Sequence, residues 1–263
     1  MMKGKPEFAA AAAPAELARL KSSALAGLDC LYVGDEFCQA KLPSAAELKR
    51  LRTVFPGRLV VVSSFLTDAW LARFKKLALA LAGREEYGFV VNDLGALSWL
   101  RGLRGFRPAV SLGRVLVHDL GEFIRSSRFR LLFGGMALSA EIDSAFDLAV
   151  CSAAPGLGLN LQVPMKFSAF SRNCYVTGRL NSKTCLACKG AKYEKLPPGP
   201  VRERLYLRAN ALFTGNAAEF PAPRVAAMAA SRLPVGRVVF NGEFSGAAAF
   251  FRGLGAALKG RRS

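Results

Sequence analysis

The sequence is poor in histidine and in acidic residues, and it has no long apolar run. Its 263 residues include 1 His and 19 Asp plus Glu, against 37 Lys plus Arg. A single histidine excludes zinc sites of the Cys2His2 type, and the His-Glu-x-x-His and Gly-x-Ser-x-Gly motifs of hydrolases do not occur. No run of 18 or more uncharged apolar residues is present, so no membrane span is expected.

Cysteine is also scarce, and the few cysteines point to metal binding more than to disulfides. The 6 Cys are too few for a disulfide scaffold at this length, whereas 52% hydrophobic residues support a sizeable core. No apolar segment of signal-peptide type follows the early lysines, so we expect a cytoplasmic protein with reduced thiols. We interpret residues 1–27, which contain an alanine run, as a lead-in outside the folded domain.

Short apolar runs rich in β-branched residues alternate with helical patterns along the rest of the chain. Near-continuous apolar runs are typical of strands in parallel sheets, and their alternation with helices indicates βαβ units. The expected strands are Leu28–Val33, Arg58–Ser64, Gly88–Val91, Ala109–Leu112, Arg130–Phe133, Asp147–Val150, Leu159–Val163, Leu205–Ala211 and Arg237–Phe240. The expected helices are Ser44–Arg52, Thr67–Leu81, Asp93–Leu100 and Phe244–Leu258. Residues 28–263 are therefore predicted to form a single-domain, TIM-like α/β barrel of the (β/α)8 type, in preference to an open doubly wound sheet.

An irregular stretch, Phe167–Pro200, follows a late strand and carries half of the cysteines. Cys174, Cys185 and Cys188 are spaced as C-x10-C-x2-C, a pattern that holds zinc or an iron–sulfur centre. Both centres usually take four ligands, and the remaining candidates are Cys30, Cys38 and Cys151. Cys38 follows the first expected strand, on the face where barrel active sites collect, so it can meet the late cysteines there.

Several other polar residues are candidates for binding a substrate. Asn92 and Asp93 end the third expected strand, although Asp93 also suits a helix N-cap. Arg114 and Arg172 are candidates for two-point binding of a carboxylate, and Arg172 precedes Cys174 by two positions. The segment with Glu141 and Asp143 is open to two readings, a carboxylate pair or a solvated loop. The sole histidine, His118, suits a solvated or capping position.

Several segments in a fixed order resemble the collagenase-like peptidase family U32. They are Leu31-Tyr-Val-Gly34 with Cys38, Val91-Asn-Asp-Leu-Gly-Ala-Leu97, Ser111-Leu-Gly-Arg114, Ser139-Ala-Glu-Ile-Asp143, and Val163-Pro-Met-Lys-Phe-Ser168 leading into Arg172-Asn-Cys174. One early cysteine and three in the second half are most similar to the family's iron–sulfur branch, which acts in oxygen-independent ubiquinone biosynthesis. The resemblance covers about Leu28 to Cys188.

The resemblance implies a cofactor, a partner and a reaction. Cys38, Cys174, Cys185 and Cys188 would hold a 4Fe-4S cluster. The chain would form a heterodimer with a sister barrel and hydroxylate a small-molecule quinone precursor, with prephenate as the hydroxyl source. No catalytic residue follows from it. Two alternatives stay open: an RNA (tRNA or rRNA) hydroxylation factor of the same family, favoured by the net charge of +18, and a peptidase or metal-stabilised scaffold.

Overall fold

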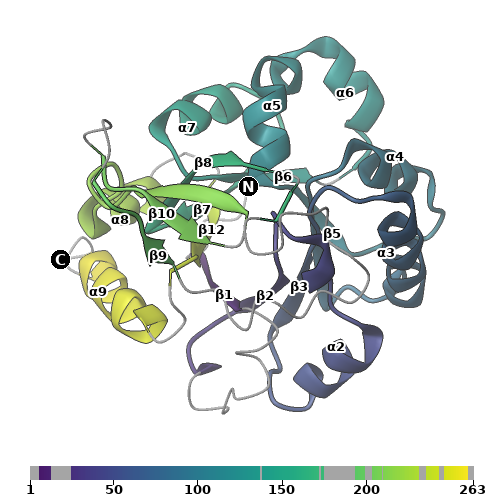
Figure 1. The fold of residues 1–263 in the computed structure, drawn as a ribbon, viewed down its shortest axis with the longest axis horizontal. Helices are drawn as coiled ribbons and strands as arrows, with labels where there is room; N and C mark the ends of the chain where they lie inside the picture. Colours follow the sequence, from purple (N-terminus) through teal and green to yellow (C-terminus); the bar gives the residue numbers. More distant parts are fainter. Residues whose placement is uncertain are drawn as a thin grey trace.

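Eight parallel strands form a closed barrel at the centre of the molecule (Figure 1). The computed structural model describes residues 6–12, 25–136, 138–171, 173–174, 193–198, 203–208, 210–230, 235–242 and 246–259. In their order around the barrel the strands are β1 (Glu7–Ala12), β12 (Val235–Phe240), β7 (Gly158–Val163), β6 (Leu138–Ile142), β5 (Ala109–Leu112), β4 (Tyr87–Val91), β3 (Arg58–Val62) and β2 (Cys30–Gly34). The chain is thus a single-domain TIM-like (β/α)8 barrel, as predicted.

Helices surround the barrel and bury its outer face. They are α2 (Ala45–Arg52), α3 (Asp68–Leu81), α4 (Leu94–Gly102), α5 (Arg114–Arg125), α6 (Ser127–Phe133), α7 (Ala145–Ser152), α8 (Ala222–Ala230) and α9 (Ala247–Lys259). The main core lies between these helices and the outward side chains of the strands. Ser44 and Glu47 form the capping box expected at the start of α2. Within the described ranges, no helix has both the length and the apolar character needed to cross a membrane.

The barrel begins earlier than the sequence indicated, because β1 lies inside the expected lead-in. β1 pairs in parallel with β12 on one side and β2 on the other, so it closes the barrel. Ala9 faces the barrel interior, while Phe8 and Ala10 belong to the outer core. Alanine is depleted in strands in general, and the alanine run therefore gave no strand signal. Here the alanines of β1 pair with residues of β12 and β2 and are largely buried in the closed barrel.

Three expected strands have a different structure. Arg130–Phe133 lies in helix α6 and Asp147–Val150 in helix α7. Short apolar runs do not distinguish strand from helix by themselves, and here Ser126 and Ser144 accept the backbone N–H groups that start the two helices. Leu205–Ala211 contains the short strand Tyr206–Arg208 and the first residue of the strand Ala211–Gly215, both outside the barrel.

A second, antiparallel sheet is inserted between β7 and β12, where an irregular stretch was expected. Its order is β8 (Met165–Phe170), β11 (Ala211–Gly215), β10 (Tyr206–Arg208) and β9 (Glu194–Lys195); we call it the covering sheet. The amide of Asn241, just after β12, binds the backbone of Met165 at 2.9 and 2.7 Å. Asn216, just after β11, donates to the carbonyl oxygens of Asp143 and Gln162 at 2.8 and 2.9 Å. These side chains fasten the covering sheet to the carboxyl ends of the barrel strands.

A substitution at Gly34, the last residue of β2, tests how closely β2 and β3 are packed. Its φ is +122°, and an added Cβ would collide with the carbonyl oxygen of Val62 on β3. We expect Gly34→Ala to lower the free energy of unfolding by about 3 kcal/mol or more, because strain and overlap add. Gly105 has φ +73° but open space around it, so Gly105→Ala should cost only about 1 kcal/mol. Urea unfolding followed by circular dichroism measures both, and equal losses would contradict this account.

Candidate functional site

Aromatic side chains close the centre of the barrel mouth. Phe37, in the loop after β2, stacks on Phe167 of β8 with ring centroids 4.9 Å apart and meets the edge of Phe213 of β11 at 5.3 Å. All three belong to one small buried cluster between barrel and covering sheet. We call these three rings the aromatic plug. Phe37 also lines a first cavity, by the loops after β2 and β3, and Phe167 lines a second cavity, by the ends of β5 and β6.

A buried ion triad lies beside this aromatic plug. Arg114, at the start of α5, places Nε and Nη2 each 2.6 Å from Oε2 of Glu36, in the loop after β2. Its Nη1 lies 3.1 Å from Oδ2 of Asp143, just after β6. The three side chains are almost completely shielded from solvent. Arg114 was expected to bind substrate, and its guanidinium is already engaged by two carboxylates of the protein.

Asp143 also ties the covering sheet to the barrel. Its Oδ2 accepts the backbone N–H of Phe167 at 2.6 Å as well as the Arg114 contact. Burial raises the pKa of Asp143 to about 7, although Arg114 and the Phe167 N–H oppose the rise. This carboxyl group therefore changes its charge near neutral pH.

Asn92 binds neighbouring backbone inside the protein and is not a lining residue of either the first or the second cavity. Its amide nitrogen donates to the carbonyl oxygen of Ser63 at 2.8 Å, and its Oδ1 accepts the N–H of Val115 at 3.1 Å. It is fully buried, and a Cβ at Gly113 would collide with its amide group. Asn92 thus joins the ends of β3, β4 and β5, and the Ser-Leu-Gly-Arg segment needs its glycine because this amide fills the space.

A second ion cluster holds the loop after β2 against the covering sheet. Oδ2 of Asp35 lies 3.1 Å from Nζ of Lys41 and 3.7 Å from Nη2 of Arg208 on β10. Burial alone would raise the pKa of Asp35, but Lys41 and Arg208 outweigh it and hold that pKa below its usual value. Arg208 also donates to the hydroxyl of Tyr193 at 3.0 Å. The loop that carries Phe37 and Cys38 is therefore held at both ends.

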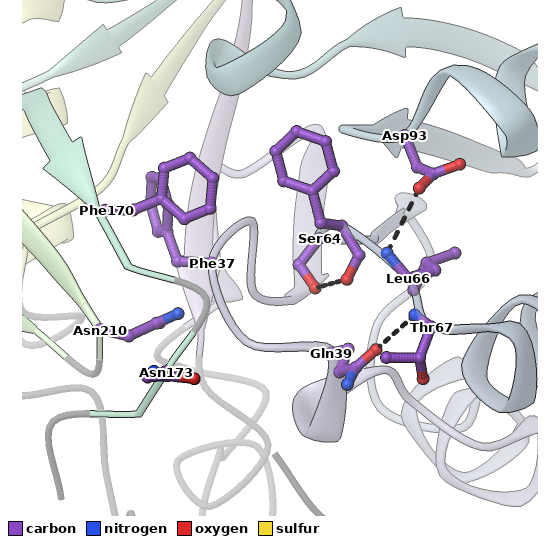
Figure 2. A pocket seen from close by; sticks show the side chains of 10 residues that line it. Phe37, Gln39, Ser64, Leu66, Thr67, Asp93, Phe170, Asn173 and Asn210 are labelled. Carbon is purple, nitrogen blue, oxygen red and sulfur yellow. Dashed lines mark hydrogen bonds between the residues drawn. The ribbon is translucent and has the colours of Figure 1, made fainter. Parts of the chain in front are cut away.

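The first cavity measures about 330 Å³ and is partly apolar. Figure 2 shows the aromatic rings of its wall on one side and the Gln39, Thr67 and Asp93 group on the other. Its lining residues are Phe37, Gln39, Ser64, Phe65, Leu66, Thr67, Asp93, Phe170, Asn173 and Asn210. Phe65 and Phe170 stack with their ring centroids 5.4 Å apart.

The polar wall of the first cavity is held by hydrogen bonds to backbone. Oε1 of Gln39 accepts the N–H of Thr67 at 2.9 Å. Asp93 caps α4 by accepting the N–H of Ala96 at 2.8 Å, and its other oxygen accepts that of Leu66 at 3.3 Å. Of the substrate-binding candidates that the structure describes, Asp93 is thus the one that lines this cavity, and it also serves as the helix cap.

Two of the four expected cluster ligands lie beside the first cavity. Cys38 sits between the lining residues Phe37 and Gln39, and Cys174 follows the lining residue Asn173. Both are buried, at 5% and 3% exposure. Cys185, Cys188 and Arg172 lie outside the described residues. Within the described part of the chain, no three His, Cys, Asp or Glu side chains are grouped to hold a metal.

The two other cysteines belong to the core. Cys30 lies on β2 inside the barrel, where its thiol donates to Oε2 of Glu7 at 3.6 Å. Cys151 lies on α7 in the outer core. Burial raises the pKa of both thiols to about 12, which disfavours the thiolate that a metal needs. Of the three candidates for the fourth ligand, Cys38 is the one beside a cavity at the barrel mouth.

Glu141 lies inside the barrel, so neither the carboxylate pair nor the solvated loop describes it. Its oxygens accept bonds from Tyr32 at 2.9 Å, Asn160 at 2.8 Å and Gln162 at 2.7 Å. Burial raises its pKa. Tyr32 in turn accepts a bond from Arg237 at 2.9 Å. Polar residues at alternate positions of β6 and β7 were the available sequence signal for this polar interior.

No model of a known protein family matches the chain, and no curated protein matches it either. Among solved structures, it is similar to a glycoside hydrolase family 18 N-acetylglucosaminidase from Paenibacillus barengoltzii, with a TM-score of 0.49, 8% identity, and coverage of 97% of this chain and 99% of that one. It is also similar to the chitinase ChiW from Paenibacillus sp. str. FPU-7, with a TM-score of 0.45, 10% identity, and coverage of 97% of this chain and 33% of that one. Likeness at this level says nothing of substrate or chemistry.

The Arg114 triad makes a direct prediction about stability. Arg114→Met would leave Glu36 and Asp143 buried without their cation, so the free energy of unfolding should fall by about 3–5 kcal/mol. Arg125→Met is the matched control, because Arg125 is 48% exposed and its pair with Glu122 lies in solvent. That change should stay within about 0.5 kcal/mol. Chemical denaturation measures both, and a loss below about 1 kcal/mol for Arg114→Met would show that the triad contributes little.

Proposed function

We propose that the chain holds a 4Fe-4S cluster and takes part in oxygen-independent hydroxylation, as one half of a heterodimer. By its resemblance to the UbiV-type members of family U32, the pathway is ubiquinone biosynthesis and the partner is a UbiU-like sister barrel. The ligands are Cys38, Cys174, Cys185 and Cys188, and the acceptor is a quinone precursor. The hydroxyl source is prephenate.

The single observation that carries the proposal is the placement of Cys38 and Cys174. They come from the loop after β2 and from the segment after β8, which are far apart in sequence. Each adjoins residues that line the first cavity, and each is buried. Two buried cysteines whose sequence neighbours line one cavity, on the face where barrel active sites collect, are compatible with half of a four-cysteine site. The other half would come from the C-x2-C pair of Cys185 and Cys188.

The residues around the first cavity suit a redox centre that must be kept from water. When bound, the cluster would supply electron transfer. The stacked rings of Phe65 and Phe170, with Phe37 beside them, form an apolar wall near Cys38 and Asn173. An apolar surround limits solvent access, which tunes the potential of such centres. The ion pairs of Asp35 with Lys41 and Arg208 hold the loop that carries Cys38 against the covering sheet.

The net charge of +18 favours one competing acceptor, RNA. A basic surface attracts the phosphate backbone without reading a sequence. Both acceptors need the same cluster, so cluster content does not separate them. Rescue of quinone synthesis does, because an RNA-modifying protein would not restore it.

The first test concerns the metal. Anaerobically purified protein should be brown, with about four iron and four sulfide per chain. Cys185→Ala and Cys188→Ala should each lose the colour, because each removes a proposed ligand. Cys30→Ala is the matched control and should keep it, since Cys30 lies in the barrel interior. Stoichiometric zinc without sulfide in such a preparation would refute the proposal.

The second test concerns the hydroxyl donor. Arg172 is proposed to orient a dicarboxylate by a planar two-point contact that lysine does not reproduce. Arg172→Lys should therefore keep the iron but lose turnover. The measurement is anaerobic complementation of a strain that lacks its ubiquinone-pathway homologue, with and without the sister gene.

The outcomes of this complementation are distinct. Rescue should require the sister gene, because the proposed unit is a heterodimer. Full rescue by Arg172→Lys would refute the donor role of Arg172. No rescue by the wild-type pair, in protein that carries its cluster, would remove the quinone assignment and favour RNA.

A further inference from the structure

The second cavity, which Phe167 of the aromatic plug lines, has no role in the proposed hydroxylation. It measures about 300 Å³ and lies between α5, α7 and the covering sheet. Its lining residues are Arg114, His118, Asp143, Ser144, Phe146, Asp147, Lys166, Phe167, Ser168, Glu203 and Thr214. We propose that this cavity binds a small organic cation, an ammonium group carried on an apolar or aromatic body.

The first argument is the charge of the buried triad. Glu36, Arg114 and Asp143 carry two negative charges and one positive charge when Asp143 is ionised. The neighbouring cluster of Asp35, Lys41 and Arg208 carries one net positive charge, so the two clusters together are neutral. Of the two triad carboxylates, Asp143 lines the second cavity and Glu36 does not, so a cation in that cavity would pair with Asp143.

The second argument is that two oxygens on the cavity wall, Oδ1 of Asp143 and the hydroxyl of Thr214, are available to accept a hydrogen bond. Asp143 is 3% exposed, and both of its side-chain hydrogen bonds end on Oδ2, so Oδ1 accepts none from the described residues. Thr214 is also buried, and its hydroxyl makes no hydrogen bond within the described ranges. An ammonium group donates several hydrogen bonds, and these two oxygens both accept them.

The third argument is the balance of the remaining charges. Both cations on the wall already have carboxylate partners outside it: Arg114 pairs with Glu36, and Lys166 lies 3.3 Å from Glu219. The acidic side chains Asp147 and Glu203 line the cavity in addition to Asp143. The hollow is therefore acidic in a chain whose net charge is +18. Such a chain repels cations in general, so any measured cation affinity must come from a local site.

The fourth argument is the presence of aromatic rings on the cavity wall. Phe146, the second residue of α7, is 70% exposed at the cavity wall, and Phe167 lies deeper. An exposed phenyl ring beside carboxylates attracts an organic cation through its face and through its apolar area. Inorganic cations gain less from such a ring, because they keep their water.

The probe for the test is benzylammonium, titrated into the full chain by calorimetry, with benzyl alcohol as its neutral analogue. Benzylammonium should bind at least about tenfold more tightly than benzyl alcohol, because charge-assisted hydrogen bonds are the stronger ones. Asp143→Asn should weaken benzylammonium about tenfold, and Phe146→Ala about threefold. Leu131→Ala is the matched surface control, since Leu131 is 82% exposed on α6, and it should change nothing.

The pH dependence of benzylammonium affinity distinguishes loss of the Asp143 charge from a change in the structure of the cavity. Because the pKa of Asp143 lies at about 7, benzylammonium affinity should rise about tenfold from pH 6 to pH 8. The ionisable groups around Asp143 are Glu36, Arg114, Asp147, Lys166 and His118. The series is repeated with His118→Asn, because His118 also lines the cavity, and this variant should keep the rise.

The proposal is overturned by any of three results. They are equal binding of benzyl alcohol, unchanged benzylammonium affinity in both Asp143→Asn and Phe146→Ala, and full competition by potassium at equal concentration, which would indicate an inorganic cation site. Asp143→Asn is first checked for cooperative unfolding. If it does not fold, Phe146→Ala and Glu203→Gln decide, because both positions are exposed. Loss of the cluster would leave this result unchanged, so the two proposals fail separately.

Discussion

The buried guanidinium of Arg114 is the interaction on which the arrangement of the barrel mouth depends. It joins the loop after β2, through Glu36, to the end of β6, through Asp143. Asp143 in turn holds the backbone of Phe167 at the start of the covering sheet. One cation thus fixes three segments that the chain brings together from distant positions. A hydrogen-bonded buried triad of this kind fixes how the segments are arranged more than it adds to the free energy of unfolding. Removing one member lowers that free energy, because the remaining charges are left buried without a partner.

The position of the covering sheet follows from this constraint. Phe167 and Phe213 are held against Phe37, and cavities lie beside these rings: Phe37 lines the first and Phe167 lines the second. The first adjoins Cys38 and Cys174 and has an apolar wall. The second is lined by carboxylates and by an exposed phenyl ring. The same rings therefore lie between a proposed redox site and a proposed cation site. Substitutions can be made in one site without changing residues of the other.

Much of the barrel could be predicted from the sequence, because strands buried on both faces leave apolar runs, as at β2, β3, β4 and β7. The failures have physical reasons. β1 consists largely of alanine, which packs well in a crowded barrel but has little strand preference. β6 carries Ser139 and Glu141 toward a polar interior, so its run is interrupted. The helices α6 and α7 are short and apolar, and only their serine caps distinguish them from strands.

The candidate site was predictable in part, and for the same reason. The position of Cys38 follows from the rule that barrel loops after strands share one face, and the structure places it there beside a cavity. The partners of Arg114 and Asn92 were not predictable, because Glu36, Asp143 and Ser63 lie far from them in sequence and meet only through the fold. The raised pKa of Asp143 likewise depends on burial by the covering sheet.

The central claim is that Cys38 of the barrel and the cysteines of the inserted segment hold one cluster. The most direct measurement is the electron paramagnetic resonance spectrum of the anaerobic, dithionite-reduced protein, compared with that of Cys38→Ser. We expect the wild type to give the signal of a reduced 4Fe-4S cluster, and Cys38→Ser to shift or abolish it, because a ligand to iron has changed. A wild-type protein without such a signal, or an identical spectrum in Cys38→Ser, would contradict the claim.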